Sequence, residues 1–110
     1  TGEDTLSLHD ALPICSSERS AIATDLSQWS MVANRDAITR SYQFKDFKEA
    51  FAFMTQCALM AEQMNHHPEW FNVWNRVEVT LSTHDAGGLT KLDLDLARSM
   101  DRYANALLAK

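Results

Sequence analysis

The chain contains few glycines and prolines and no long hydrophobic run. Its 110 residues include three glycines and two prolines, and 45% are hydrophobic. This composition excludes collagen-like, low-complexity and disordered chains. No apolar run approaches the roughly 18 residues of a membrane-spanning helix, and no basic segment followed by an apolar one marks a secretory signal. We therefore expect one compact domain in the cytoplasm with no membrane partner.

Cysteine is also scarce, and the basic residues do not cluster. Cys15 lies in a polar leader and Cys57 among apolar residues, so no disulfide is expected. Residues 1–33 hold five acidic residues against Arg19 alone, which accounts for −4 of the net charge of −5. The rest is nearly neutral and has no basic cluster. The sequence thus gives no sign of direct nucleic-acid binding, which requires clustered Lys and Arg.

Residues 1–15 are expected to be a foreign or disordered leader. Residues 5–14, TLSLHDALPI, have no helical or strand period and resemble the translation of a common sequencing adaptor. We therefore give His9 and Cys15 no functional weight.

The body begins with a short predicted helix and a hairpin. Residues 16–26 offer a serine N-cap and apolar positions at helical spacing. Residues 29–32 and 37–44 favour strands, and Asn34, Arg35 and Asp36 favour the turn between them. We expect Trp29 in the core.

A long amphipathic helix is expected next. Asp46 is a predicted N-cap with Glu49 as its capping-box partner. Pro68 predicts the end of the helix near Asn65 or His66. The predicted apolar stripe contains Phe47, Ala50, Phe51, Met54, Ala58, Ala61 and Met64, and we expect Phe47, Phe51 and Met54 in the core.

Residues 71–81 alternate between apolar and polar, which predicts strand. Their length indicates a tight turn near residues 74–76 and thus a hairpin, or one long bent strand. Trp70 and Trp74 are candidates for pure core aromatics.

Residues 84–88 are expected to form a loop with the flexible Gly87-Gly88 pair. Thr90 and Asp93 predict the start of a final helix that runs to about Leu107. The element order α-β-β-α-β-β-α predicts an α+β fold with two layers: one four-stranded antiparallel sheet with helices packed on one face. We expect residues 16–110 to form this single domain.

Three histidines lie where predicted elements end. His66 and His67 follow the long helix, and His84 follows the last strand. Imidazole exchanges protons near neutral pH, and reactive side chains are often presented at such junctions. Taken alone, a His-His pair before proline is more often a surface loop.

The string NHHPEWFNVWNRVEVTLSTHDAGGLTKLDLDLA, residues 65–97, resembles the signature of the pterin-4a-carbinolamine dehydratase family. The family is also called dimerisation cofactor of a homeodomain transcription factor. Residues 35–54, RDAITRSYQFKDFKEAFAFM, fit it too. The resemblance covers about residues 16–107, and it departs mildly at Trp74, where the family often has tyrosine.

The resemblance implies a dehydratase that converts 4a-hydroxytetrahydropterin to quinonoid dihydropterin, without metal or cofactor. His66, His67 and His84 correspond to the catalytic histidines. We expect His66 and His84 to transfer the protons and His67 mainly to hold the pterin. The residues expected to contact the substrate or support the site are Glu62, Pro68, Trp70, Thr83 and Asp93.

Two of these roles have structural alternatives. An acidic residue three positions after Thr90 can cap the helix whatever else it does, so Asp93 has a purely structural role as an alternative to a role in the site. Three histidines can bind zinc, but adjacent His66 and His67 should point different ways, which makes a shared ion awkward.

A different class of function is an interaction module acting as a transcriptional coactivator, because vertebrate relatives stabilise a transcription-factor dimer. We also expect self-association as a homodimer or homotetramer through exposed apolar residues on the long helix or at the sheet edge.

Overall fold

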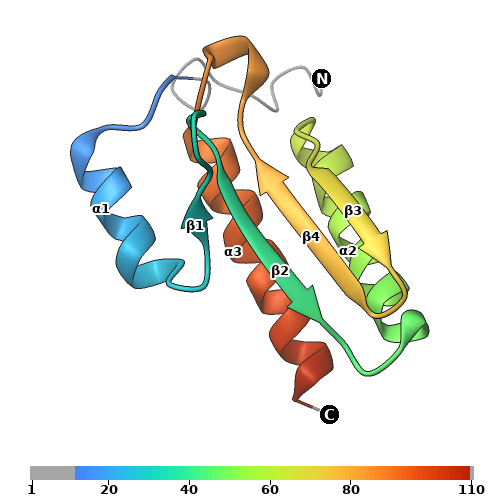
Figure 1. The fold of residues 1–110 in the computed structure, drawn as a ribbon. Coiled ribbons are helices and arrows are strands. Elements are labelled where there is room, and N and C mark those ends of the chain that lie inside the picture. The colour runs from blue at the N-terminus through green and yellow to red at the C-terminus, as the bar shows by residue number, and fades with distance from the viewer. Residues whose placement is uncertain (1–11, 110) are drawn as a thin grey trace.

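The protein folds into two layers in a computed structural model that describes residues 12–109 (Figure 1). The elements are α1 (Ser16–Asp25), β1 (Ser30–Met31), β2 (Ile38–Gln43), α2 (Phe47–Met64), β3 (Glu69–Val73), β4 (Arg76–Leu81), the short 3-10 helix η2 (His84–Ala86) and α3 (Lys91–Leu108). The four strands form one antiparallel sheet, and the fold class and element order predicted from the sequence are confirmed.

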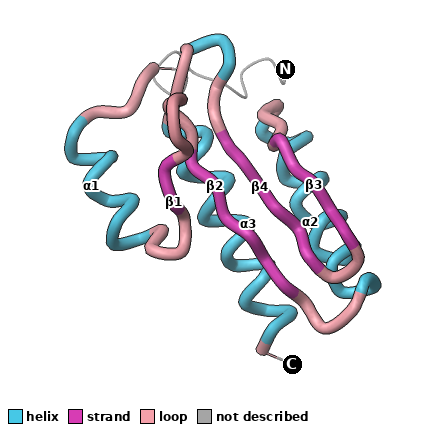
Figure 2. The backbone as a smooth tube through the Cα atoms, viewed as in Figure 1, coloured by secondary structure: helices cyan, strands magenta, loops and turns pink. Residues whose placement is uncertain are grey.

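The strand order β1-β2-β4-β3 places β4 inside the sheet, beside β2 and β3 (Figure 2). Ile38 pairs with Leu81 in β4, and Glu69 in β3 pairs with Thr80. The beginning of β3 therefore lies beside the end of β4. This register brings the segment after α2 close to the segment after β4, which are the two segments that carry the histidines.

Helices α2 and α3 pack together behind the sheet, and α1 lies at the side of β1 (Figure 1). Their shared core includes Tyr42, Phe53, Val77, Val79, Leu96 and Met100, all with almost no exposed surface. Trp29 is buried as predicted. None of the helices within residues 12–109 combines the length and apolarity needed to cross a membrane.

The buried face of α2 differs from the prediction. Phe47 and Phe51 are 50% and 55% exposed, whereas Phe53 and Cys57 are fully buried and Met54 is half-buried. The two apolar stripes lie side by side on the same helix, so periodicity alone could not choose between them. Contacts with the sheet make the choice, because the Phe53 ring packs 4.6 Å from that of Tyr42.

The segment predicted at residues 71–81 forms a hairpin rather than one bent strand, and its first strand begins two residues earlier, at Glu69. Trp74 adopts a left-handed backbone conformation in the turn, at φ 50°, and its side chain is exposed. The neighbouring Asn75 is buried and donates from its side-chain amide to the Phe44 carbonyl at 2.8 Å. Trp74 is therefore a surface residue, not a core aromatic.

The end of the predicted leader contacts the domain. Ile14 is buried, and its backbone N–H donates to the Leu89 carbonyl at 3.1 Å. Pro13 forms an isolated bridge with Thr90. Residues 1–11, including His9, lie outside the described residues. Both cysteines are free thiols, and burial raises the pKa of Cys57 to about 12.

A polar cluster ties the sheet to α3. The Asp101 carboxylate accepts hydrogen bonds from the Trp29 indole at 3.1 Å, the Arg40 guanidinium at 2.6 Å and the Tyr42 hydroxyl at 2.5 Å. Burial and the Asp101 carboxylate raise the pKa of the Tyr42 hydroxyl far above its ordinary value. None of these four residues lines the cavities that the site histidines line.

Candidate active site

The end of α2 directs the histidine pair. Asn65 ends the helix in the left-handed conformation, at φ 51°, and the His66 N–H still donates to the Ala61 carbonyl at 3.0 Å. This hydrogen bond and the left-handed residue form a standard helix C-terminus. Pro68 follows in the extended link to β3, as the sequence predicted.

His66 belongs to a buried hydrogen-bond network. Its Nε2 lies 2.6 Å from Oδ1 of Asp93, whose side chain is fully buried. The second carboxylate oxygen of Asp93 accepts from the Thr83 hydroxyl at 2.8 Å and from the Thr90 N–H at 2.9 Å. Asp93 is thus both a helix cap and the partner of a site histidine, two roles that the sequence could not separate.

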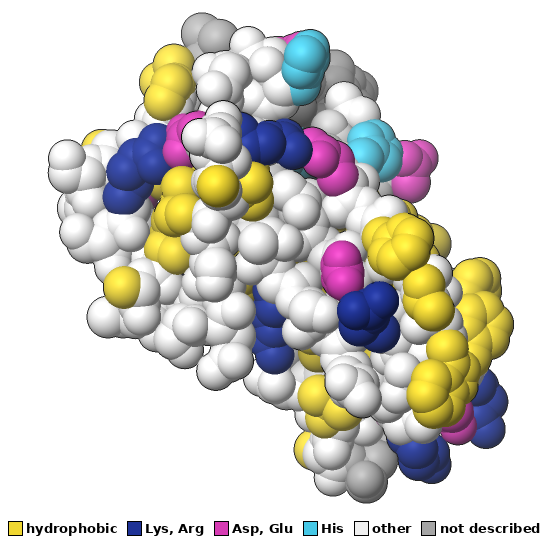
Figure 3. All heavy atoms as spheres, in the orientation of Figure 1, with side chains coloured by type: hydrophobic (Ala, Val, Ile, Leu, Met, Phe, Trp, Pro, Cys, Tyr) yellow, Lys and Arg dark blue, Asp and Glu magenta, His cyan; other side chains and the backbone are white. Residues whose placement is uncertain are grey.

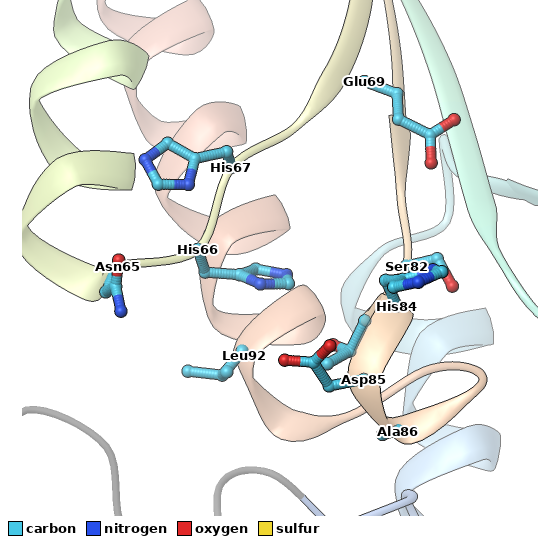
Figure 4. A pocket seen from close by; sticks show the side chains of 10 residues that line it. Asn65, His66, His67, Glu69, Ser82, His84, Asp85, Ala86 and Leu92 are labelled. Atoms are coloured by element: carbon cyan, nitrogen blue, oxygen red, sulfur yellow. The ribbon is translucent and has the colours of Figure 1, made fainter.

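His67 points away from this network and pairs with Glu62. Its Nε2 lies 2.6 Å from the Glu62 carboxylate, and both side chains are exposed. The sequence placed Glu62 one helical turn before His66, but its partner in the structure is His67. In Figure 4 the rings of His66 and His67 extend in opposite directions from adjacent backbone positions.

His84 enters the site from the other side, on the short helix η2. The loop is closed by two hydrogen bonds between Thr83 and Gly88, at 3.0 and 3.2 Å. The φ of Gly87 is 73°, which favours glycine. Within residues 12–109 the His84 ring has no hydrogen-bond partner, and the side chain is exposed. The position of this ring is therefore set by the backbone of its loop.

A cavity of about 410 Å³ lies between the two histidine-bearing segments. The lining residues are Asn65, His66, His67, Glu69, Ser82, Thr83, His84, Asp85, Ala86 and Leu92. Figure 4 shows the His66 ring extending from the α2 side toward the segment that carries His84. The cavity is large enough for a small bicyclic ligand and has both polar and apolar walls.

A second hollow of about 230 Å³ adjoins the first, since Glu69, Ser82, Thr83 and His84 line both. It also contacts Arg35, which forms a two-point ion pair with Glu69 at 2.7 and 2.8 Å. The Arg35 guanidinium lowers the pKa of the Glu69 carboxyl. Figure 3 shows histidines at this end of the molecule beside a row of alternating basic and acidic side chains.

Four of the five residues predicted to contact the substrate or support the site do not line the main cavity. Trp70 is half-buried and lines a separate shallow hollow with Phe71 and Glu78. Pro68, Glu62 and Asp93 do not line the main cavity, whereas Thr83 does. Among the described residues, no three His, Cys, Asp or Glu side chains gather closely enough to hold a metal ion.

Comparison with known protein families shows which family the chain belongs to. The sequence profile described as pterin 4 alpha carbinolamine dehydratase matches residues 13–103. The chain belongs to this family. Its match begins inside the predicted leader, two residues before Cys15.

Family members from Burkholderia are similar in sequence to this chain over most of their length. A protein of Burkholderia orbicola with a provisional name as a pterin-4-alpha-carbinolamine dehydratase is 59% identical over 91 residues, which cover 83% of this chain and 89% of that protein. A Burkholderia pseudomallei protein of the same provisional name is 58% identical over 88 residues, or 80% and 87% of the two chains.

A solved structure shares the fold. The crystal structure of a transcriptional coactivator/pterin dehydratase from Brucella melitensis is 51% identical and superimposes with a TM-score of 0.79. The alignment covers 84% of this chain and 98% of the Brucella chain.

Sequence reasoning missed part of the cavity wall. Ser82, Asp85 and Leu92 flank residues that the motif singled out, but their side chains have no distinctive spacing. The sequence pattern at Arg35 and Asp36 indicates only a turn. Their place beside His84 depends on the pairing of β2 with β4, which no local pattern indicates.

Proposed function

We propose that this chain removes water from a 4a-hydroxytetrahydropterin by histidine acid-base catalysis and releases the quinonoid dihydropterin. The observation that carries the proposal is the cavity walled by His66, His67 and His84 in a member of the pterin 4 alpha carbinolamine dehydratase family. The names of the Burkholderia relatives and the Brucella structure support the same substrate class.

The reaction needs two proton transfers. One group protonates the hydroxyl at C4a so that the C–O bond breaks and water leaves. Another accepts the proton of N5, and the electron pair of that N–H bond forms the new C4a=N5 double bond. Imidazoles suit both transfers near neutral pH. The reaction is a net loss of water and requires no oxidant.

We assign the N5 proton to His66 and the departing hydroxyl to His84. The Asp93 carboxylate holds one nitrogen of the His66 ring at 2.6 Å, which leaves the other nitrogen to accept a proton. The same carboxylate stabilises the positive charge that the ring then acquires. His84 is exposed, so it can regain its proton from solvent. His67, oriented by Glu62, holds the pterin.

A dehydratase assay with purified protein tests the assignment. His66→Ala and His84→Ala should each lower kcat about a hundredfold or more, because a positioned acid or base contributes roughly 10²–10⁴ to the rate. His67→Ala should mainly raise KM. Gln63→Ala, an exposed position on α2, serves as the control. Full activity in both His66 and His84 variants would overturn the mechanism.

We further propose that the enzyme acts in the cytoplasm in recycling of the tetrahydropterin cofactor, as a homodimer or homotetramer. Exposed apolar side chains support self-association and lie on α2 and the β3-β4 hairpin: Phe47, Phe51, Leu59, Phe71, Val73 and Trp74. Light scattering on the eluting peak of a sizing column measures the assembly, and a monomer at micromolar concentration would contradict it.

A role as a transcriptional coactivator is the second candidate, because the Brucella protein is described as a transcriptional coactivator as well as a pterin dehydratase. Loss of a coactivator effect in the His84→Ala variant would tie the two roles together, whereas an unchanged effect would separate them.

A further inference from the structure

The turn between β1 and β2 contacts the loop that carries His84. The Asp36 carboxylate accepts a hydrogen bond from the Leu89 N–H at 3.0 Å, one residue beyond the Gly87-Gly88 pair. The Asp36 backbone carbonyl accepts from the Ser82 hydroxyl at 2.9 Å, two residues before His84. Asp36 is therefore bonded to both ends of the His84 loop.

The packing of Asp36 against this loop is close. A Cβ atom added at Gly88 would lie 2.3 Å from Oδ2 of Asp36 and 3.0 Å from its Cβ. Such contacts are far inside van der Waals distance, so glycine is required here for the approach of the carboxylate rather than for backbone freedom. Gly88 also closes the loop on Thr83.

The carboxylate is held from its other side by α1. Arg19 donates to both Asp36 oxygens, at 2.9 and 2.8 Å. This two-point geometry fixes the direction of the carboxylate as well as its charge. The Arg19 guanidinium and the Leu89 N–H keep the pKa of Asp36 below its ordinary value, so the group is ionised at neutral pH.

His84 needs such support more than the other two histidines. His66 is held by Asp93 and His67 by Glu62, but the His84 ring has no partner among residues 12–109. Its place depends on the loop backbone, and the loop is held by Asp36. We propose that Asp36, braced by Arg19 and fitted against Gly88, is a positioning residue that places His84 for proton transfer. This inference rests on the proposed dehydratase function.

Kinetics of the full chain test the proposal. Asp36→Ala should lower kcat about tenfold to a hundredfold, because a displacement on the order of 1 Å costs up to about a hundredfold in rate. KM should change much less, since His66 and His67 keep their places. Asp36→Asn can still accept a hydrogen bond from the Leu89 N–H but loses the charge opposite Arg19. Its kcat should therefore lie between those of Asp36→Ala and the unmodified protein.

The control is Asp25→Ala. Asp25 also lies on the surface and pairs with an arginine, Arg98 at 3.4 Å, but it does not contact the loop. Its kcat should match that of the unmodified protein.

A double-variant cycle separates positioning from general damage. If Asp36 acts through His84, Asp36→Ala should cause little further loss of kcat in a His84→Ala background. An equal loss in both backgrounds would overturn the inference, as would full kcat in Asp36→Ala. Gly88→Ala provides an independent variant, which should lower kcat strongly alone and less when combined with Asp36→Ala.

A measurement without substrate keeps the inference distinct from the proposed function. The NMR signal of the His84 ring, assigned with His84→Ala, should shift in Asp36→Ala and not in Asp25→Ala. An unmodified protein without dehydratase activity would reject the proposed function, while an unmoved His84 signal in Asp36→Ala would reject the inference.

Discussion

At the scale of single residues, Asp93 joins stability to chemistry. Its carboxylate caps α3 by accepting a hydrogen bond from the Thr90 N–H. The same carboxylate accepts a hydrogen bond from the Thr83 hydroxyl and orients the His66 ring. A buried carboxylate is costly unless its oxygens are satisfied, and here three donors satisfy them. Its substitution should therefore affect both folding and turnover.

Asp93→Asn tests this dual role. Replacing one oxygen by an amide leaves a donor facing another donor, so the free energy of unfolding should fall by about 1–3 kcal/mol. The variant should also lose at least about tenfold in kcat, because His66 loses its charged partner. Urea denaturation and the dehydratase assay measure the two effects.

The matched control is Asp46→Ala, which removes a helix cap that accepts the Glu49 N–H at 2.8 Å and contacts no histidine. It should cost about 1 kcal/mol with kcat unchanged. A similar kcat in Asp93→Asn and Asp46→Ala would show that Asp93 serves as a helix cap and has no role in turnover.

At the scale of elements, the two ends that bear histidines are each shaped by a left-handed residue. Asn65 ends α2, and Gly87 ends η2, both at positive φ. Asn65 lines the main cavity, and Gly87 lines the adjoining hollow. The placement of the imidazoles thus depends on how these helices end as well as on the sheet.

Substitution of Asn65 should reveal the conformational requirement. Asn65→Ala should lower the free energy of unfolding by about 1 kcal/mol, because a Cβ without a compensating polar group is strained in the left-handed region. Asn65→Gly should retain it within about 0.5 kcal/mol. Urea denaturation of both variants measures the difference, with the exposed Gln63→Ala as control. Equal stability of the two Asn65 variants would contradict this interpretation of the helix end.

At the scale of the whole molecule, the polar cluster around Asp101 and the histidine cavity lie in different regions. Tyr42 in β2 and Trp29 before β1 are both bonded to Asp101 in α3. The cluster joins the sheet and the last helix across a long stretch of sequence. Its titration should therefore affect global unfolding rather than the site.

Alkaline pH should weaken the fold through Tyr42. Its pKa is raised in the folded state, so above about pH 10, the ordinary value, the unfolded chain binds fewer protons than the native one. The free energy of unfolding should then fall as pH rises, by up to about 1.4 kcal/mol per pH unit from this group.

Urea denaturation between about pH 9 and pH 11 measures the slope. The slope should be shallower in Tyr42→Phe, which has no proton to lose, while Tyr103→Phe, at a half-buried position on α3, provides the tyrosine control. An identical slope in the unmodified protein and Tyr42→Phe would show that Tyr42 does not govern the alkaline limit.

The sequence by itself determined the order of helices and strands and identified the three histidines as candidate site residues. Caps at Asp46 and Thr90, the stop at Pro68 and the alternation in β4 are local signals, because hydrogen bonds and side-chain direction repeat over a few residues. The histidine motif was readable for the same reason. The length of the alternating segment at residues 71–81 favoured a hairpin and left one long bent strand open, and the structure forms the hairpin over residues 69–81.

Only the tertiary structure decided what depends on packing between distant segments. The apolar surface of α2 is too broad for periodicity to predict which face is buried. In the structure Phe53 packs on Tyr42, and Phe47 and Phe51 are exposed. The pairing of β2 with β4 brought Asp36 to the His84 loop, 53 residues away from its partner Leu89. Such contacts are set by which strands become neighbours, and no pattern within a short stretch of chain carries that information.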